Sequence, residues 1–304
     1  MDGRSGSKIL VLGSLNLDLV FRMPRMPDAG ETLASTGSAT FCGGKGANQA
    51  VACARMGADV AMLGRIGSDP AGQMLRDALA EEGIATGSVL VSDDCTSGTA
   101  VIVLTPDGQN RILLAAGANG ELSPGDIAAH EAAFANAALL VCQLEVPLET
   151  VEAGIAMAAA RGIPVLLNPA PASALPDALV AQVDYLVPNE TEAAALTGIS
   201  VTDDASAEEA AQNLRARGAG CVVITRGPAG ITIADAQDCR HMAALPADVV
   251  DTTAAGDSFI GGFATGLSEG LTVDEAAALG LRVARHCIGR TGAQASLPRR
   301  HEIG

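Results

Sequence analysis

Short apolar runs alternate with helical patterns along most of the chain, and this alternation limits the possible folds more than any other feature of the sequence. The runs are typical of strands that are buried on both faces, and they cover residues 8–13, 139–143, 165–168, 185–188 and 221–225. Strands that alternate with helices predict a mainly parallel sheet with helices on both faces. In such a sheet, ligands bind beyond the carboxyl ends of the strands.

Helix boundaries can be assigned between these runs. One helix is expected to begin at Pro70, because proline suits the first turn, and to end at Gly83. A second is expected to begin at Ser206, where Glu209 would complete a capping box, and to end at Gly218.

Two stretches depart from this alternation. Residues 99–116 have the pattern of two strands around a Pro106-Asp107-Gly108 turn, which indicates a hairpin. Residues 16–41 contain prolines and show little helical periodicity. We interpret the segments at about 16–41 and 97–116 as excursions that form a small β lid on a single domain spanning residues 1–304, since no linker divides the chain.

Charge and composition exclude several classes of function. Lys and Arg number 19 against 35 Asp and Glu, which gives a net charge of -16, and no basic run occurs, so we expect no nucleic-acid or anionic-membrane partner. Aromatic residues make up only 2% of the chain, so stacking on aromatic side chains cannot be the main means of ligand recognition.

The cysteines and the N-terminal residues indicate the compartment. Seven scattered cysteines and four scattered histidines show no zinc-site spacing, and the odd cysteine count favours reduced thiols over a disulfide framework. The first eight residues are polar and unlike a signal peptide, and no strongly apolar run reaches about 18 residues. We therefore expect a soluble, cytoplasmic protein.

A glycine-rich loop at residues 41–48 precedes an alanine-rich helical pattern. Such loops let backbone N–H groups approach an anion or a polyol closely. Neither common nucleotide motif fits, because Gln49 stands where a third glycine is required and Gly46, instead of Ser or Thr, follows Lys45. Taken alone, such a loop is more often a tight turn at the start of a helix than a binding site.

A second small-residue cluster, residues 251–259, leads into an apolar helix. Ala254, Ala255 and Gly256 leave backbone N–H groups unobstructed at the helix N-terminus, and Asp257 lies in the first turn. This arrangement can stabilise charge on a transferred phosphoryl group while Asp257 takes a hydroxyl proton. The alternative is an aspartate that only stabilises the helix dipole.

Two further motifs follow expected strands. Asn189 and Glu192 form a capping-box pattern, and they could also serve as a donor near nucleotide phosphates and as a carboxylate that holds Mg²⁺ through water. Residues 225–230 are either an ordinary glycine-rich turn or a turn that passes under an adenosine. Glu145 follows another strand, and because an unpaired buried carboxylate is costly, we expect it to have a hydrogen-bonding partner.

The order of these motifs resembles the ribokinase-type carbohydrate kinases over residues 8–304. The segments that carry the resemblance are 13–18, 43–48, 144–145, 168–171, 189–192, 224–230, 251–257 and 292–294. The resemblance implies a three-layer α/β/α sandwich with a small β-sheet lid, and ATP-dependent phosphorylation of D-ribose at its 5-hydroxyl. Alternatives are a kinase for deoxyribose, fructose or a nucleoside, and a non-catalytic sugar-binding regulator, against which the intact Asp257 and Gly256 argue.

The resemblance also implies a role for each matching residue. Asp257 is implied as the base, with Ala254, Ala255 and Gly256 as the anion hole. The implied sugar ligands are Asn16, Asp18, Gly43, Gly44, Lys45, Asn48, Glu145 and Asp257. The implied ATP-binding residues are Asn189, Thr225, Arg226, Gly227, Pro228, Ala229, Gly230, Gly256 and Leu281. Glu192 is implied for Mg²⁺, and Asp251, Thr253, Cys287, Arg290, Gly292 and Ser296, several through backbone carbonyls, for an activating K⁺.

Two residues depart from the family pattern. Ile260 stands where asparagine is common, and Leu281 stands where a polar side chain is common, so the resemblance leaves the adenine contacts near both undetermined. Relatives of this kind commonly pair through their lids. The apolar residues on both faces of the 99–116 hairpin point in the same direction, and we therefore expect a homodimer.

Overall fold

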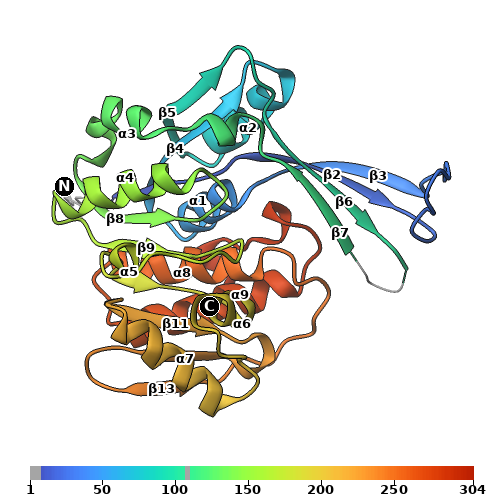
Figure 1. Cartoon of the computed structure of the whole chain (residues 1–304). Helices are drawn as coiled ribbons and strands as arrows, with labels where there is room; N and C mark the ends of the chain where they lie inside the picture. Colours follow the sequence, from blue (N-terminus) through green and yellow to red (C-terminus); the bar gives the residue numbers. More distant parts are fainter. Residues whose placement is uncertain (1–7, 107–109) are drawn as a thin grey trace.

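A nine-stranded sheet forms the centre of the computed structural model, which describes residues 8–106 and 110–304 (Figure 1). Its strands, in spatial order, are β13 (Cys239–Met242), β12 (Ile231–Ala234), β11 (Cys221–Thr225), β10 (Tyr185–Leu186), β9 (Val165–Leu167), β8 (Ala137–Cys142), β1 (Lys8–Leu12), β4 (Asp59–Gly67) and β5 (Ala85–Ser92). All neighbours pair in parallel except β12, which is antiparallel to both β11 and β13. The expected mainly parallel sheet is therefore confirmed.

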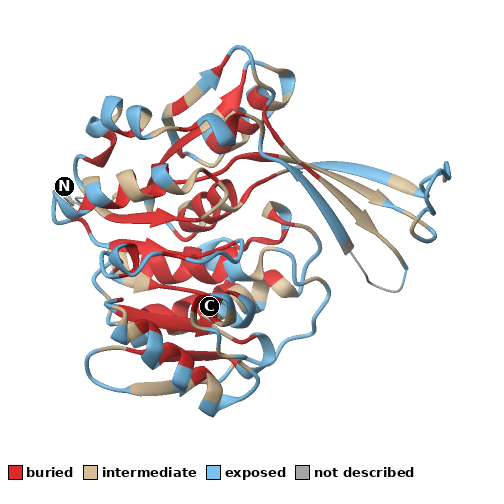
Figure 2. Cartoon of the chain, viewed as in Figure 1, coloured by how far each residue is buried: buried red, intermediate tan, exposed pale blue. Residues whose placement is uncertain are grey.

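Alternation of side chains along each strand builds a core on both faces of this sheet. In β1, Ile9 and Val11 belong to one buried cluster and Leu10 and Leu12 to the other, and all four are fully buried. One face is covered by α1 (Lys45–Arg55), α2 (Pro70–Glu81), α8 (Ala255–Ser268) and α9 (Val273–Ile288). The other is covered by α3 (Pro124–Ala129), α4 (Leu148–Ala159), α5 (Asp177–Val180), α6 (Glu190–Thr197) and α7 (Asp204–Ala216). Figure 2 shows these buried residues concentrated in the strands and the inner sides of the helices.

A separate four-stranded sheet projects from this body (Figure 1). It has the order β3 (Gly37–Gly43), β2 (Asn16–Arg22), β6 (Gly98–Leu104) and β7 (Asn110–Ala115). The two excursions meet where β2 pairs in parallel with β6, so segments far apart in the sequence form one sheet. Part of the expected turn, Asp107 and Gly108, lies outside the described residues. Exposed and partly exposed residues dominate this sheet (Figure 2).

The helix signals were correct at α2, whereas the start predicted for α7 was wrong. Asp69 caps α2 through its side chain, and Pro70 is the first helical residue, as expected. Helix α7 instead begins at residue 204, because the carboxylate of Asp203 accepts both the N–H and the hydroxyl of Ser206, at 2.8 and 2.6 Å. Ser206 is thus the third residue of the helix and not its cap. Short 3-10 helices complete the structure at Gly117–Glu121 (η1), Glu131–Phe134 (η2), Gly227–Ala229 (η3), Gln294–Ser296 (η4) and Arg300–Glu302 (η5).

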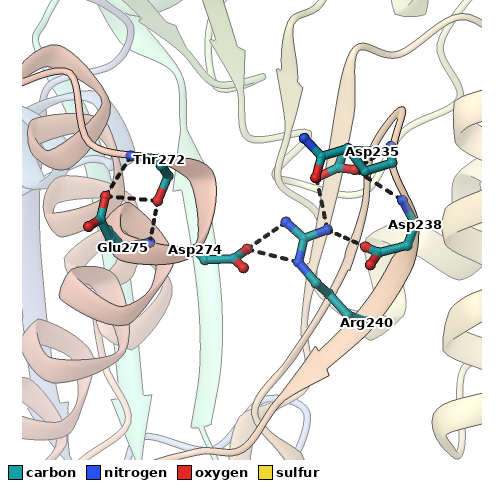
Figure 3. Close-up of polar contacts among 7 residues, drawn as sticks. Asp235, Asp238, Arg240, Thr272, Asp274 and Glu275 are labelled. Atoms are coloured by element: carbon teal, nitrogen blue, oxygen red, sulfur yellow. Dashed lines mark hydrogen bonds and ion pairs between the residues drawn. The ribbon is translucent and has the colours of Figure 1, made fainter.

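A cluster of ion pairs ties the antiparallel edge of the large sheet to α9 (Figure 3). Arg240 of β13 donates to Asp274 in the first turn of α9 at 2.8 Å, and it also pairs with Asp235 and Asp238 at 2.8 and 2.6 Å. Single exposed pairs contribute little to stability, but a guanidinium shared by three carboxylates fixes geometry. The β12–β13 hairpin and α9 are therefore held together, and both line the larger cavity described below.

Candidate active site

The N-terminus of α8 presents unpaired backbone N–H groups next to a buried carboxylate. Ala254, the N-cap residue, has φ +60°, a left-handed conformation that costs roughly 1–2 kcal/mol for a residue other than glycine. Within the described residues, the N–H groups of Ala254, Gly256 and Asp257 have no hydrogen-bond partner, whereas that of Ala255 donates to Thr252 at 3.2 Å. A Cβ built on Gly256 would meet nothing within 4 Å. This helix terminus is therefore open to an anion.

The glycine-rich loop before α1 is closed by the chain itself. Lys45 N–H donates to Glu145 at 3.1 Å, Gly46 N–H to the Ser14 hydroxyl at 3.3 Å, and Ala47 N–H to the Ser14 carbonyl at 2.9 Å. A Cβ on Gly46 would lie 2.5 Å from the Ser14 nitrogen. Of the two readings of this loop, the structure favours the tight turn, since the glycines let α1 pack against the end of β1.

Two amides from α1 hold the carboxylate of Asp257. Asn48 Nδ2 donates to Oδ2 at 3.1 Å, and Gln49 Nε2 donates to Oδ1 at 2.9 Å. Burial raises the pKa of Asp257, against the opposing effects of Lys45 and of these two amides. In the sequence Gln49 stood out only as a missing glycine, and no signal linked it to a residue 208 positions away.

Lys45 supplies the positive charge at this site. Burial lowers the pKa of Lys45, but Asp257, Glu145 and Glu192 outweigh burial and hold it above its ordinary value. Among the described residues its ammonium group has no hydrogen-bond or ion-pair partner, although it lines the cavity beside Asp257. An unpaired, half-buried ammonium in that position can receive a negatively charged ligand.

The expected sugar ligands lie together where β2 and β3 leave the body of the molecule. Asn16 pairs with Gly43 in the small sheet, and a Cβ on Gly43 would lie 2.2 Å from a carboxylate oxygen of Asp18. Burial, together with the negative charges of Glu145 and Asp257, raises the pKa of Asp18 to about 7. The cluster thus concentrates carboxylates that can accept hydrogen bonds from hydroxyl groups.

The hydrogen-bonding partners of Glu145 lie within the chain itself. Its Oε2 accepts from the Ser14 hydroxyl at 2.6 Å, from Lys45 N–H at 3.1 Å and from Asn16 Nδ2 at 3.3 Å. The chain therefore satisfies this oxygen without a ligand. Its Oε1 has no partner among the described residues.

Asn119 was missed by the sequence analysis. It is 1% exposed and lies in η1, directly after the small sheet. Its side chain accepts from Leu15 N–H at 2.9 Å and donates to the Leu15 carbonyl at 3.0 Å and to Asn16 Oδ1 at 2.8 Å. Asn119 therefore fixes the junction of β1 and β2, where Asn16, the first of the expected sugar-binding residues, lies.

Two cavities meet over the N-terminus of α8. The smaller, 220 Å³, is polar and is lined by Lys45, Asn168, Asn189, Glu192, Thr225 and Asp257, with Ile260 among its other residues. The larger, 430 Å³, is mainly apolar and is lined by Thr225, Gly227, Pro228, Gly230, Leu281 and Ala284, among others. Thr225, Thr252, Ala255 and Gly256 line both. The arrangement fits a ligand with an apolar body and an anionic end.

The residues implied for the nucleotide do not all line a cavity. Arg226 and Ala229 line neither of these two cavities, and the Arg226 guanidinium pairs with Asp204 at 2.6 Å. Ile260 lines the polar cavity beside Asp257 and not the apolar one, since it lies one turn further along α8. Leu281 does line the apolar cavity.

Asn189 and Glu192 form the capping box that their spacing predicts. Glu192 N–H donates to Asn189 Oδ1 and Asn189 N–H to Glu192 Oε2, both at 2.8 Å, while Asn189 Nδ2 donates to Oε1 at 2.9 Å. Burial raises the pKa of Glu192. Both oxygens of this carboxylate are therefore engaged within the chain, at the edge of the polar cavity.

The two segments expected to hold K⁺ lie side by side. Asp251 accepts from Thr253 N–H and Gly292 N–H, both at 2.9 Å, and these bonds outweigh burial and hold its pKa below the usual range. Cys287 lies 3.6 Å from the Thr253 carbonyl and 3.0 Å from the Ser296 hydroxyl. The Arg290 side chain points instead to Glu302, at 2.7 Å.

In residues 8–106 and 110–304, none of the helices is both long and apolar enough to cross a bilayer. Likewise, no three or more His, Cys, Asp or Glu side chains in this part of the chain are grouped so as to hold a metal ion.

Comparison with known proteins agrees with this geometry. The ribokinase of Haemophilus influenzae is 42% identical over 294 residues, covering 97% of this chain and 96% of that protein. The deoxyribokinase of Salmonella typhi is 38% identical over 291 residues, 95% of each. The structure of Arabidopsis thaliana ribokinase complexed with ribose and ATP matches with a TM-score of 0.92 at 30% identity, over 98% of this chain and 97% of that one.

The sequence profile described as "pfkB family carbohydrate kinase" matches residues 7–300, almost the whole chain. The relatives match over a similar length, and the Arabidopsis thaliana structure shares the fold. The family predicted from the order of the motifs is therefore confirmed, and the chain belongs to the pfkB family of carbohydrate kinases.

Proposed function

We propose that the chain transfers the γ-phosphoryl group of ATP to the 5-hydroxyl of D-ribose. The observation that carries this proposal is the position of Asp257. Its buried carboxylate lies beside the unpaired N–H groups at the start of α8, with the residues implied for sugar binding on one side and the two cavities on the other. The ribokinase name of the Haemophilus influenzae relative and the ribose and ATP bound in the Arabidopsis thaliana structure support the same substrates.

The reaction follows from this placement. Asp257 accepts the proton of the 5-hydroxyl group while the oxygen of that hydroxyl forms a bond to the γ-phosphorus. At the same time the bond from the γ-phosphorus to the bridging oxygen breaks, and ADP leaves with that oxygen. The N–H groups of Ala254 and Gly256 stabilise the negative charge on the transferred group, together with the helix dipole. Lys45 lines the same cavity and balances charge there.

The sugar would be held by polar groups alone. We assign hydroxyl contacts to Asn16, Asp18, Asn48 and Glu145, with Gly43 and Gly44 shaping the site. Asn48 Oδ1 is buried and has no partner among the described residues, and a sugar hydroxyl could donate a hydrogen bond to it. Glu145 Oε1 offers a second acceptor. A site built from such groups rejects a sugar that lacks a hydroxyl, because buried polar atoms are then left unpaired.

The nucleotide would lie across the two cavities, with its adenosine between η3 and α9 and its phosphates toward Asn189 and Gly256. Mg²⁺ bound to ATP neutralises charge on the phosphates. Glu192 fits a water-mediated role toward that ion and not direct ligation, since both its oxygens already accept hydrogen bonds from Asn189.

A monovalent cation such as K⁺ would join the two segments around Asp251 and Gly292. The backbone carbonyls near Thr253 and Ser296 suit such an ion, and its effect would be to fix the loop that precedes the anion hole. A shift of about 1 Å in catalytic geometry can cost on the order of 10²-fold in rate.

The small sheet would act as a lid over the sugar and as a dimer interface. Ile112, Leu113 and Leu114 of β7 are 58%, 66% and 49% exposed, so both faces of this strand present apolar side chains to solvent. A partner lid of the same composition would cover one of these faces.

An ADP-release assay over D-ribose, 2-deoxyribose, fructose and a nucleoside tests the proposed reaction. We expect kcat/KM for ribose to exceed that for 2-deoxyribose by at least roughly 10²-fold. Equal values would favour the deoxyribokinase activity carried by the Salmonella typhi relative.

A substitution tests the proposed base. Asp257→Asn should keep ribose binding and lose roughly 10²- to 10⁴-fold in turnover. Glu149→Gln, which changes an exposed first-turn carboxylate of α4, is the matched control and should turn over normally. Normal turnover of Asp257→Asn would remove Asp257 from the mechanism.

A further inference from the structure

We propose that Gln49 is a positioning residue that holds the carboxylate of Asp257 in the orientation in which it receives the sugar proton. This inference rests on the proposed function, in which Asp257 is the base. It concerns a side chain that has no free polar atom for a substrate and that donates directly to Asp257.

Every hydrogen-bonding atom of the Gln49 side chain is used within the protein. The side chain is fully buried. Its Nε2 donates to Asp257 Oδ1 at 2.9 Å and to Asn168 Oδ1 at 3.1 Å, and its Oε1 accepts from Gln143 Nε2 at 2.6 Å. Rotating the amide by 180° would place its oxygen against the two acceptor oxygens, so only one orientation is compatible with its neighbours.

The partners of Gln49 are anchored to the central sheet. Gln143 directly follows β8, and Asn168 directly follows β9. Asn168 is fixed in turn, because its Nδ2 donates to the Val187 carbonyl at 2.9 Å. Through Gln49 the first turn of α8 is thus tied to the carboxyl ends of two central strands, which orient the carboxylate of Asp257.

Gln49 differs from its neighbour Asn48 in a way that separates positioning from binding. Asn48 donates to Asp257 as well, but its own Oδ1 is buried without a partner in the described part of the chain, so it retains capacity for a ligand. The Gln49 side chain has no polar atom without a partner. It therefore has none to offer a substrate, and its direct contact with the base is the hydrogen bond to Asp257.

The electrostatic effect of Gln49 on Asp257 has a definite sign. The charged groups around Asp257 are Lys45 of α1, Asp18 of β2, Glu192 of α6 and Glu145 after β8. Lys45 favours the ionised base and the three carboxylates oppose it. Donation from Gln49 also favours the ionised form, so its loss leaves a carboxylate that holds its proton to higher pH.

The test is the pH dependence of kcat for Gln49→Met, which keeps the length of the side chain and removes the amide. Rates are measured at saturating D-ribose and MgATP, because kcat reports the complex in which sugar covers Asp18. We expect the acid limb, the range of low pH in which kcat rises as the base ionises, to move up by about one pH unit. On that limb kcat should then fall by about 10-fold at a given pH, and much of the rate should be recovered at higher pH. The Kd for D-ribose should change by less than about threefold.

Thr265→Val is the matched control. It removes a fully buried hydroxyl from α8, about 12 Å along the helix from Asp257, and should leave the acid limb in place. A Gln49→Met enzyme whose kcat falls without a shift of the limb, or does not fall, would overturn the proposal.

Two further variants keep the result interpretable. Should Gln49→Met fail to fold, Gln143→Met tests the positioning role in its place. This variant removes the hydrogen bond from Gln143 to Gln49 Oε1 and leaves the contacts of Asp257 in place. A limb shifted in the same direction supports the proposal and an unchanged limb overturns it. Asp257→Asn in the same assay separates the proposed function from the positioning role. An active Asp257→Asn enzyme would refute Asp257 as the base. An inactive one, combined with an acid limb that does not shift in Gln49→Met, would refute only the positioning role of Gln49.

Discussion

Asparagine in place of Asp18 should stabilise the sugar-free protein at pH 8 while weakening its binding of ribose. Burial, with Glu145 and Asp257 adding to it, raises the pKa of Asp18 from 3.8 to about 7. The folded state therefore keeps a proton that the unfolded chain releases near pH 4. The stability linked to that proton is present at low pH and is lost as the pH rises toward and through 7.

The size of the effect follows from that shift. The pKa of Asp18 moves by about three units, and each unit corresponds to about 1.4 kcal/mol, so the ionised side chain costs up to about 4 kcal/mol of unfolding free energy at pH 8. Asp18 is only partly buried and its neighbours respond to its charge, so we expect Asp18→Asn to recover about half, roughly 2 kcal/mol. For a chain of this size that is an increase in Tm of about 4 °C.

Thermal unfolding without sugar, at pH 5 and at pH 8, measures this difference, and titration calorimetry measures ribose binding. Asp94→Asn, at an exposed position, is the control and should not change Tm. The stabilisation should be present at pH 8 and should shrink at pH 5, where the native carboxyl is protonated. An equal shift at both pH values, or a lower Tm at pH 8, would refute the reasoning.

Three further outcomes are expected. Asn119→Ala leaves buried polar groups of Leu15 and Asn16 unpaired, at a cost of roughly 1–3 kcal/mol each. The free energy of unfolding, measured by chemical denaturation, should therefore fall by about 3 kcal/mol, and KM for ribose should rise more than kcat changes. At constant ionic strength, K⁺ should raise turnover above that in Na⁺ or tetramethylammonium and Asp251→Ala should abolish the gain, whereas equal rates in all three salts would contradict the cation site. Light scattering at micromolar concentration should show a dimer that Leu113→Asp converts to a monomer, and a wild-type monomer would contradict the lid interface.

The local patterns in the sequence were sufficient for the architecture. Short apolar runs bounded by glycine predict doubly covered strands, because each run needs apolar neighbours on both faces, and the alternation with helices then implies parallel pairing. Where two local signals competed, sequence reasoning failed. Asp203 and Ser206 can both cap a helix, and the carboxylate of Asp203 caps α7 because it accepts both the N–H and the hydroxyl of Ser206.

The residues that are open to a ligand could not be distinguished from those that are not. The starts of α1 and α8 are both rich in small residues and cannot be told apart by that feature. Ser14 and Glu145 use the N–H groups of the first, whereas Gly256 remains open at the second, and that difference depends on segments about 30 and 100 residues away from Lys45 and Gly46.

The sequence by itself determined the strand and helix order, the family and the identity of most candidate ligands, since these depend on residue types and on neighbours within one turn or one strand. Only the tertiary structure decided which polar atoms are already paired. Gln49 meets Asp257 across 208 positions and Asn119 meets Asn16 across 103, through bonds that form when α1, α8 and the small sheet pack against the carboxyl ends of the strands. Hydrogen bonds between side chains so far apart leave no periodicity in the sequence, because their spacing is set by packing and not by the repeat of a helix or a strand.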